Sequence, residues 1–158
     1  MTTNQPGPED PTQAGAPRTK GPTRVYENDE IRVLWDATRC THVAHCMLAQ
    51  PEVFDALRRP WVDIDAADPQ SIAEAVLRCP TGALRYESKG DLPQESPPPH
   101  TEVEMRPNGP LYIRGTLRVK GPKGEVVTEE YRLALCRCGA SNNKPFCDNS
   151  HFVAGFRD

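Results

Sequence analysis

Residues 136–151 read CRCGASNNKPFCDNSH, which places three cysteines and one histidine within one short stretch. Small and turn-forming residues separate them, so the four side chains can converge on one centre with little chain between them. A structural zinc site is the general alternative, because three thiolates and an imidazole also enclose a zinc ion. Zinc sites commonly place two or more residues between paired cysteines, whereas a single residue separates Cys136 from Cys138.

The stretch resembles the CDGSH iron–sulfur domain family, and the resemblance extends from Gly109 to Phe156. Every position of the family pattern is matched except one, since Asn149 stands where the family has glycine. Asparagine readily adopts a positive φ angle, so we expect the loop to close normally. If the glycine is instead required for close approach of the backbone to sulfide, Asn149 would loosen the site. The resemblance implies a [2Fe–2S] cluster held by Cys136, Cys138, Cys147 and His151.

A neutral imidazole in place of one thiolate removes negative charge from such a cluster. Histidine ligation raises the reduction potential of Rieske centres, so we expect a higher potential here than in an all-cysteine ferredoxin. The imidazole of His151 can also be protonated, and it then has no lone pair for iron. Reduction and cluster release are therefore expected to depend on pH.

The first half of the chain has a second set of cysteines, namely Cys40, Cys46 and Cys79, the last followed by Pro80. A cysteine pair in a loop, joined by a distant cysteine–proline at a helix end, is the arrangement of small bacterial-type mono-cluster ferredoxins. The proline stops the helix and turns the chain. With its neighbouring motifs, the segment from Val25 to Tyr86 resembles the divergent mono-cluster ferredoxin family, which includes the [3Fe–4S] ferredoxins of actinobacteria.

Three thiolates suit a [3Fe–4S] cluster, whose three irons each need one outer ligand, and this is our first interpretation. A regular four-iron ferredoxin would have a cysteine near Val43, which cannot ligate. The alternative is a [4Fe–4S] cluster whose fourth iron takes His42, His45 or a solvent molecule. Either histidine could equally be an ordinary loop residue, and the cysteines could be small buried apolar residues.

Composition and proline placement divide the chain into four parts. It has 158 residues, of which 37% are hydrophobic and 17 are proline, so a large core is not expected. Domains this small usually recruit metals or disulfides for stability. We predict a disordered tail over 1–23, a mono-cluster ferredoxin-like domain over 24–90, a proline-rich linker over 91–101 and a CDGSH-type domain over 102–158.

Hydrophobic periodicity and the two resemblances together predict an α+β fold, with a small ferredoxin-like α+β domain followed by a β-rich CDGSH-type domain. The predicted strands cover residues 31–35, 61–65, 111–119 and 126–135. A helix is predicted to begin with Asp68 as its N-cap and Pro69 as its first residue, and to end at Cys79. The glycines and proline of residues 121–124 predict a turn between the last two strands.

Several classes of function find no support in the sequence. No apolar run approaches the ~20 residues needed to cross a bilayer, so we expect a cytoplasmic protein without a membrane partner. Thiols stay reduced in that compartment, which favours metal binding by clustered cysteines over disulfides. No Ser/His/Asp constellation, phosphate-binding glycine loop or basic stripe for nucleic acid is apparent. We therefore expect an electron carrier rather than an enzyme or a nucleic-acid-binding protein.

Two clusters of different ligation should differ in reduction potential, and the simplest hypothesis is a relay of single electrons from a reductase to an acceptor enzyme. Actinobacterial ferredoxins similar to the first half serve oxygenases of the cytochrome P450 type, so such an oxygenase is an expected partner. Proteins with one CDGSH motif often pair, which predicts a homodimer through the second domain. The alternative function is a labile-cluster donor or redox and pH sensor that transfers its [2Fe–2S] cluster to apo-proteins.

Overall fold

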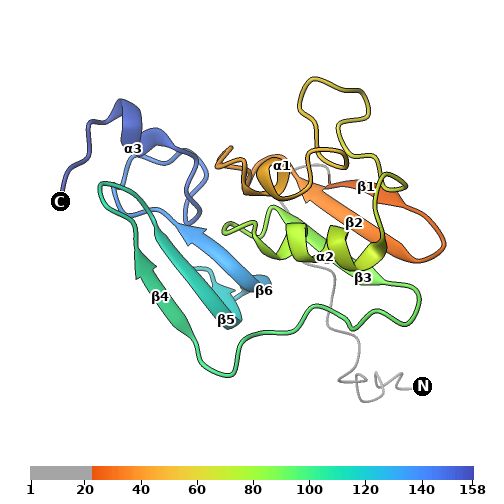
Figure 1. Cartoon of the computed structure of the whole chain (residues 1–158). Helices are drawn as coiled ribbons and strands as arrows, with labels where there is room; N and C mark the ends of the chain where they lie inside the picture. Colours follow the sequence, from red (N-terminus) through yellow and green to blue (C-terminus); the bar gives the residue numbers. More distant parts are fainter. Residues whose placement is uncertain (1–22) are drawn as a thin grey trace, which may run out of the picture.

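Two small antiparallel sheets and few helices give the chain a mixed α+β fold (Figure 1). The computed structural model describes residues 23–158. The strand order is β1-β2-β3 in the first sheet and β4-β5-β6 in the second. The predicted tail lies outside the described residues apart from Thr23, which begins β1. Within the described part, no helix is both long enough and apolar enough to span a membrane.

The elements of the first half are β1 (Thr23–Glu27), β2 (Ile31–Asp36), α1 (His45–Ala49), α2 (Pro69–Leu77) and β3 (Leu84–Ser88). β2 is the central strand, and its alternation buries Ile31 and Val33 as the sequence predicts. The core of the molecule lies in this half. Its other large buried residues are Val53, Phe54, Val62, Ile72, Val76 and Leu84.

Helix α2 confirms the predicted start. The side chain of Asp68 accepts a hydrogen bond from the backbone N–H of Ser71 at 3.0 Å, and Pro69 is the first helical residue. A carboxylate that accepts from the first turn in this way is a favoured N-cap. The helix ends at Leu77, slightly earlier than predicted, and Cys79 therefore lies just beyond its C-terminus.

The strand predicted over 61–65 is wrong, because the structure has only an isolated bridge at Val62 in that segment. Two aspartates there accept hydrogen bonds close by. Asp63 accepts from the backbone N–H of Asp65, and Asp65 accepts from the side-chain amide of Asn28. Local side-chain bonds of this kind compete with a strand ladder, so the segment forms a loop.

The elements of the second half are β4 (Glu102–Met105), β5 (Leu111–Lys120), β6 (Val126–Leu135) and α3 (Ser150–Val153). β5 and β6 pair as predicted, and the backbone N–H of Gly124 closes the turn between them by donating to the carbonyl of Gly121. β4 is an exposed edge strand that the sequence does not predict. The buried hydrophobic residues of this half are few: Leu133, Ala134, Phe146 and Cys147.

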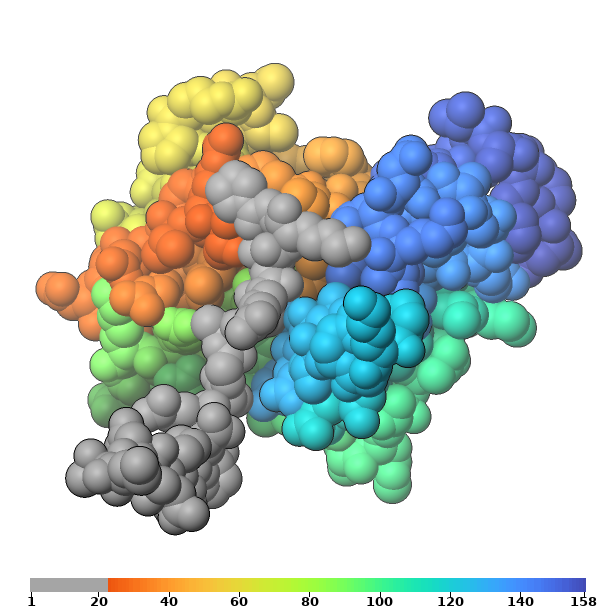
Figure 2. All heavy atoms as spheres, turned by 180° about the vertical axis from the view of Figure 1, so that it is seen from behind, coloured from red at the N-terminus to blue at the C-terminus, as the bar shows by residue number. Residues whose placement is uncertain are grey.

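The segment predicted as a linker is hydrogen-bonded to both halves. The hydroxyl of Tyr86 donates to the carbonyl of Pro93 at 2.9 Å, and the side chain of Gln94 bonds the backbone of β3. Glu95 forms an ion pair with Arg132 of β6 at 2.8 Å. The two halves are thus packed against each other, as the space-filling view in Figure 2 also shows.

Candidate metal-binding sites

The C-terminal donor residues lie on a loop that doubles back on the end of β6. The backbone N–H of Cys136 donates to the carbonyl of Pro145, and that of Cys147 donates to the carbonyl of Ala134, both at 2.8 Å. The buried hydroxyl of Ser141 closes the loop from inside by donating to a backbone carbonyl at 2.7 Å. These bonds hold the two cysteine-bearing ends of the loop together.

The four predicted donors of this loop form two close pairs. The Sγ atoms of Cys136 and Cys138 are 3.8 Å apart, and the Sγ atom of Cys147 is 3.6 Å from Nδ1 of His151. Two thiolates bound at ~2.3 Å to one tetrahedral metal stand about 3.8 Å apart, and a thiolate and an imidazole nitrogen stand about 3.6 Å apart. Each pair is therefore spaced as two ligands of one metal, which fits a cluster of two irons.

Asn149, which replaces the family glycine, has a φ of 71°. The expectation that asparagine would adopt the left-handed conformation here is confirmed. Asn149 directly precedes α3, which carries the predicted ligand His151. That imidazole is only 6% exposed, and its ring lies against the ring of Phe152 with the centroids 4.1 Å apart.

Backbone N–H groups point at the sulfur atoms of this loop. Those of Asn149 and Ala140 donate to the Sγ atoms of Cys147 and Cys138, both at 3.4 Å. Hydrogen bonds to sulfur are one means by which proteins set the potential of iron–sulfur centres. Burial raises the pKa of the Cys136 thiol, but backbone hydrogen bonds, the Cys138 side chain and the charge of Lys144 together lower this pKa overall. At Cys147 burial dominates and raises the pKa.

The three cysteines of the first half, Cys40, Cys46 and Cys79, line one small cavity. Cys40 belongs to the loop that runs into α1, Cys46 lies in the first turn of α1, and Cys79 follows α2. The loop contains His42 at a φ of 55° and Ala44 at a φ of 62°, a conformation that such residues rarely adopt. Backbone strain of this kind concentrates at functional sites, which supports a ligand-binding role for the loop.

The two loop histidines are placed differently. Nδ1 of His42 lies 3.8 Å from the Sγ atom of Cys40, whereas Nδ1 of His45 lies 3.3 Å from the carbonyl oxygen of Arg78. His42 is therefore the histidine beside a predicted ligand, and His45 is engaged with the backbone.

Burial raises the pKa of the Cys40 thiol, and burial together with nearby Cys79 raises that of Cys46 to about 11. Without metal these thiols are protonated at neutral pH, so metal binding has to displace their protons. In residues 23–158, no three Cys, His, Asp or Glu side chains are placed to hold one metal ion together. The donors instead form pairs or line a cavity, and these arrangements fit multi-iron clusters.

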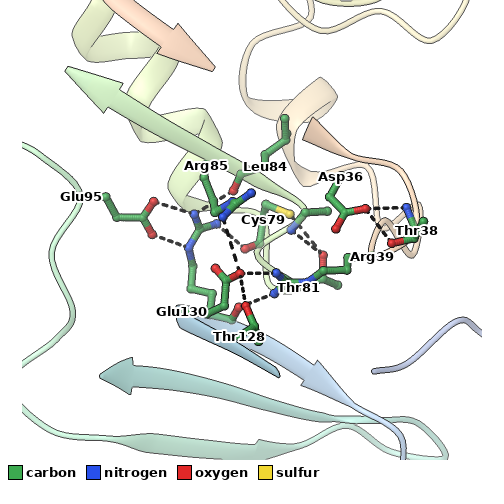
Figure 3. Close-up of polar contacts among 12 residues, drawn as sticks. Asp36, Thr38, Arg39, Cys79, Thr81, Leu84, Arg85, Glu95, Thr128 and Glu130 are labelled. Carbon is green, nitrogen blue, oxygen red and sulfur yellow. Dashed lines mark hydrogen bonds and ion pairs between the residues drawn. The ribbon is translucent and has the colours of Figure 1, made fainter. Parts of the chain in front are cut away.

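A buried polar cluster lies between the two halves of the molecule (Figure 3). Arg39, the residue before Cys40, forms an ion pair with Glu130 of β6 at 2.5 Å, and the two side chains are 4% and 3% exposed. A second guanidinium, that of Arg85, lies 3.6 Å from the same carboxylate. Burial lowers the pKa of Arg85, and the nearby charge of Glu130 opposes that effect. Glu130 thus stabilises two buried cations of the first half.

Arg132 of β6 also reaches residues of the first half. Its Nη1 donates to the carbonyl oxygens of Cys79 at 2.6 Å and Val76 at 2.8 Å, and its Nη2 donates to that of Leu84 at 2.9 Å. The carboxylate of Glu95 balances its charge. The backbone of one predicted ligand is therefore held by a side chain from the other half of the molecule.

Nothing in the sequence alone marks these residues as an interface. Thr128, Glu130 and Arg132 alternate along β6 and therefore share one face of the strand. A polar face on a strand normally predicts contact with solvent, whereas all three side chains are buried here against the first half. The alternation of polar residues was thus the only sequence feature that pointed to this face of β6. The packing of the two halves shows that the face forms an interface.

Comparison with known families agrees with this geometry. Residues 26–89 match the family model described as a divergent 4Fe-4S mono-cluster, and residues 108–152 match the one described as an iron-binding zinc finger of CDGSH type. The chain belongs to the divergent mono-cluster family through its first half and has a CDGSH-type domain in its second half. It is an iron–sulfur protein.

Two relatives from Escherichia coli match part of this chain. Over 69 residues the chain is 30% identical to the uncharacterized protein YjdI of Escherichia coli strain K12, and equally to that of Escherichia coli O157:H7. The matched stretch is 44% of this chain and 91% of each relative.

Proposed function

We propose that this protein carries single electrons between redox partner proteins and that its two clusters act in sequence. The hydrogen bond from Arg132 to the carbonyl of Cys79 carries the proposal, because it fixes β6, which ends next to Cys136, against a predicted ligand of the other site. The proposed ligands are Cys136, Cys138, Cys147 and His151 for a [2Fe–2S] cluster, and Cys40, Cys46 and Cys79 for a [3Fe–4S] cluster.

Bound iron–sulfur clusters supply one-electron exchange at potentials that ligands, burial and hydrogen bonds set. The residues of this chain supply different surroundings at the two sites. The first site offers thiolates that line a small cavity, whereas the second combines thiolates with the imidazole of His151 and backbone N–H groups directed at sulfur. These differences support unequal potentials and hence a preferred direction of electron flow.

The composition of the first cluster is part of the proposal. Three thiolates complete a three-iron cluster without any further ligand, whereas the description of the matched family names a four-iron cluster. His42, 3.8 Å from the Sγ atom of Cys40, is the residue that favours the [4Fe–4S] alternative.

The proposed partners are a reductase that supplies electrons and an acceptor enzyme such as an oxygenase of the cytochrome P450 type. Pairing of two copies through the second domain is also proposed, and the exposed edge strand β4 offers unpaired backbone groups for it. Cluster donation to apo-proteins is the competing function. The burial of His151 at 6% exposure supports the relay over donation.

The decisive experiment uses anaerobically purified protein and two single-site variants, Cys40→Ser and Cys138→Ser. Low-temperature EPR should show two iron–sulfur signals in the wild type and a different one missing from each variant. Reduced wild type should then pass electrons to oxidised cytochrome c and keep its iron when mixed with apo-ferredoxin. Transfer of iron to the apo-ferredoxin would support donation, and an iron-free, zinc-containing preparation would refute both functions.

A further inference from the structure

Two asparagines of the C-terminal ligand loop extend across to the N-terminal ligand loop. Nδ2 of Asn149 donates to the carbonyl oxygen of Thr41, and Nδ2 of Asn143 donates to that of Thr38, both at 2.9 Å. Thr41 directly follows the predicted ligand Cys40. The two loops that carry the predicted ligands are therefore joined by side-chain hydrogen bonds, although they are far apart in the sequence.

Asn149 contacts both sites at once. Its backbone N–H donates to the Sγ atom of Cys147 at 3.4 Å, while its side chain donates to Thr41. Glycine at this position could make the first bond but has no side chain for the second. Asn149 keeps the left-handed conformation that glycine would supply, with a φ of 71°, and adds a donor directed at the other half.

We infer that Asn149 is a positioning residue that clamps the two cluster-binding loops together and provides a bonded route for electrons between the clusters. This inference rests on the proposed relay function. In the transfer step, one electron leaves the reduced cluster of one site and reduces the oxidised cluster of the other, and a one-electron donor protein supplies the first electron. No bond within the protein forms or breaks.

Of the contacts between the halves, the one through Asn149 starts at a ligand sulfur and is the most direct. It runs from the Sγ atom of Cys147 through one asparagine to the residue next to Cys40. The contact from Arg132 to the carbonyl of Cys79, by comparison, leads to Cys136 only along the backbone of β6. Electron tunnelling weakens steeply with the length of the path, so loss of the Asn149 contact should slow transfer.

The test compares Asn149→Gly with Asn142→Gly in the full chain. The first variant removes the bridging amide and keeps the left-handed backbone accessible. The second makes the same change in the same loop at an exposed residue whose backbone, and not its side chain, is hydrogen-bonded in the described structure. Iron content and absorption spectra establish that both variants are loaded with clusters.

Two measurements follow. Flash photoreduction of the oxidised protein gives the rate of electron transfer between the clusters, and we expect this rate to fall in Asn149→Gly and not in Asn142→Gly. Hydrogen exchange of residues 40–46, measured by mass spectrometry on apo- and loaded protein, reports loop opening without any electron transfer. Loss of one hydrogen bond worth ~1 kcal/mol should speed that exchange about fivefold.

The two measurements separate the inference from the function on which it rests. If the wild type shows no transfer between clusters, the relay is refuted, and hydrogen exchange still decides whether Asn149 clamps the loops. Wild-type hydrogen exchange in Asn149→Gly overturns the clamp. Faster exchange with an unchanged transfer rate overturns the electron route.

Discussion

Gly82 lies directly against the backbone of Arg132, and a Cβ atom added to Gly82 would stand 2.3 Å from the Arg132 carbonyl oxygen. Gly82 has a φ of +67° and belongs to the turn that follows the predicted ligand Cys79. The backbones of the two halves of the molecule are therefore in direct contact here. Only glycine provides both the left-handed conformation and the missing side chain that this contact requires.

Gly82→Ala is expected to destabilise the protein more than Gly124→Ala does. Gly124 has a similar φ of +83° but nothing within 4 Å of its added Cβ, so its substitution measures the conformational cost alone, about 1 kcal/mol. Overlap with the Arg132 carbonyl should add ~1–3 kcal/mol at Gly82. Urea unfolding of the full chain measures both losses. Equal losses would mean that the contact between the halves opens easily.

Replacement of Arg132 by methionine should be among the most destabilising changes in the chain. The substitution leaves the carboxylate of Glu95 and the carbonyl of Cys79 without their buried donor, and removal of one partner from a buried pair costs ~3–5 kcal/mol. Arg118→Met is the matched control, because its ion pair with Glu129 is exposed, at 62% and 38%, and worth ~0–1 kcal/mol. Similar unfolding free energies for the two variants would contradict a structural role for Arg132.

The close grouping of the C-terminal cysteines, the helix cap at Asp68 and the strands of residues 111–119 and 126–135 could be predicted because each depends on local spacing. Cysteine positions, a capping residue followed by proline, and period-two alternation are all visible within a short window of sequence. The backbone conformation of Asn149 was equally predictable, because its residue type indicates it. Its bond to Thr41 was not, because that bond depends on how two separate segments pack.

The contact between the halves could not be predicted from the sequence, and the reason is physical. Glu130 and Arg132 are charged, and charged side chains on a strand normally face water. Their burial becomes favourable only because Arg39, Glu95 and backbone carbonyls supply partners. Those partners come from other parts of the chain, and no local sequence pattern predicts them. The contacts of the linker were not predictable for the same reason, since Glu95 is one of these partners.

The N-cap of α2 makes stability depend on pH at the acid end. Hydrogen bonds from the side chain and the backbone of Ser71 hold the pKa of Asp68 below its usual value. The unfolded chain therefore takes up the proton first, so the carboxylate stabilises the folded state above about pH 4 and loses this effect as the pH falls through the lowered pKa. Asp68→Ala should be less stable than wild type at neutral pH, and the difference should shrink below that range. Unfolding measured across pH tests this, with Asp91→Ala as the control at an exposed aspartate that caps no helix.

His151→Cys should lower the reduction potential of the C-terminal cluster. The substitution replaces a neutral imidazole by a thiolate and so adds negative charge at the iron that His151 is proposed to bind. The N-terminal cluster should keep its potential, and a redox titration followed by EPR measures both. Phe152→Ala is the control, since its exposed ring packs on His151 without offering a donor to metal. An unchanged C-terminal potential in His151→Cys would refute ligation by this histidine.

His42→Ala decides the composition of the N-terminal cluster. If Cys40, Cys46 and Cys79 alone hold a three-iron cluster, the variant should keep the EPR signal of an oxidised [3Fe–4S] centre and its iron content. His42 would then be a loop residue beside the Cys40 sulfur, at the observed 3.8 Å. His45→Ala is the matched control, because its Nδ1 faces the Arg78 carbonyl instead of a cysteine. A reduced [4Fe–4S] signal in the wild type that His42→Ala alters and His45→Ala preserves would make His42 the fourth ligand and overturn the three-iron assignment.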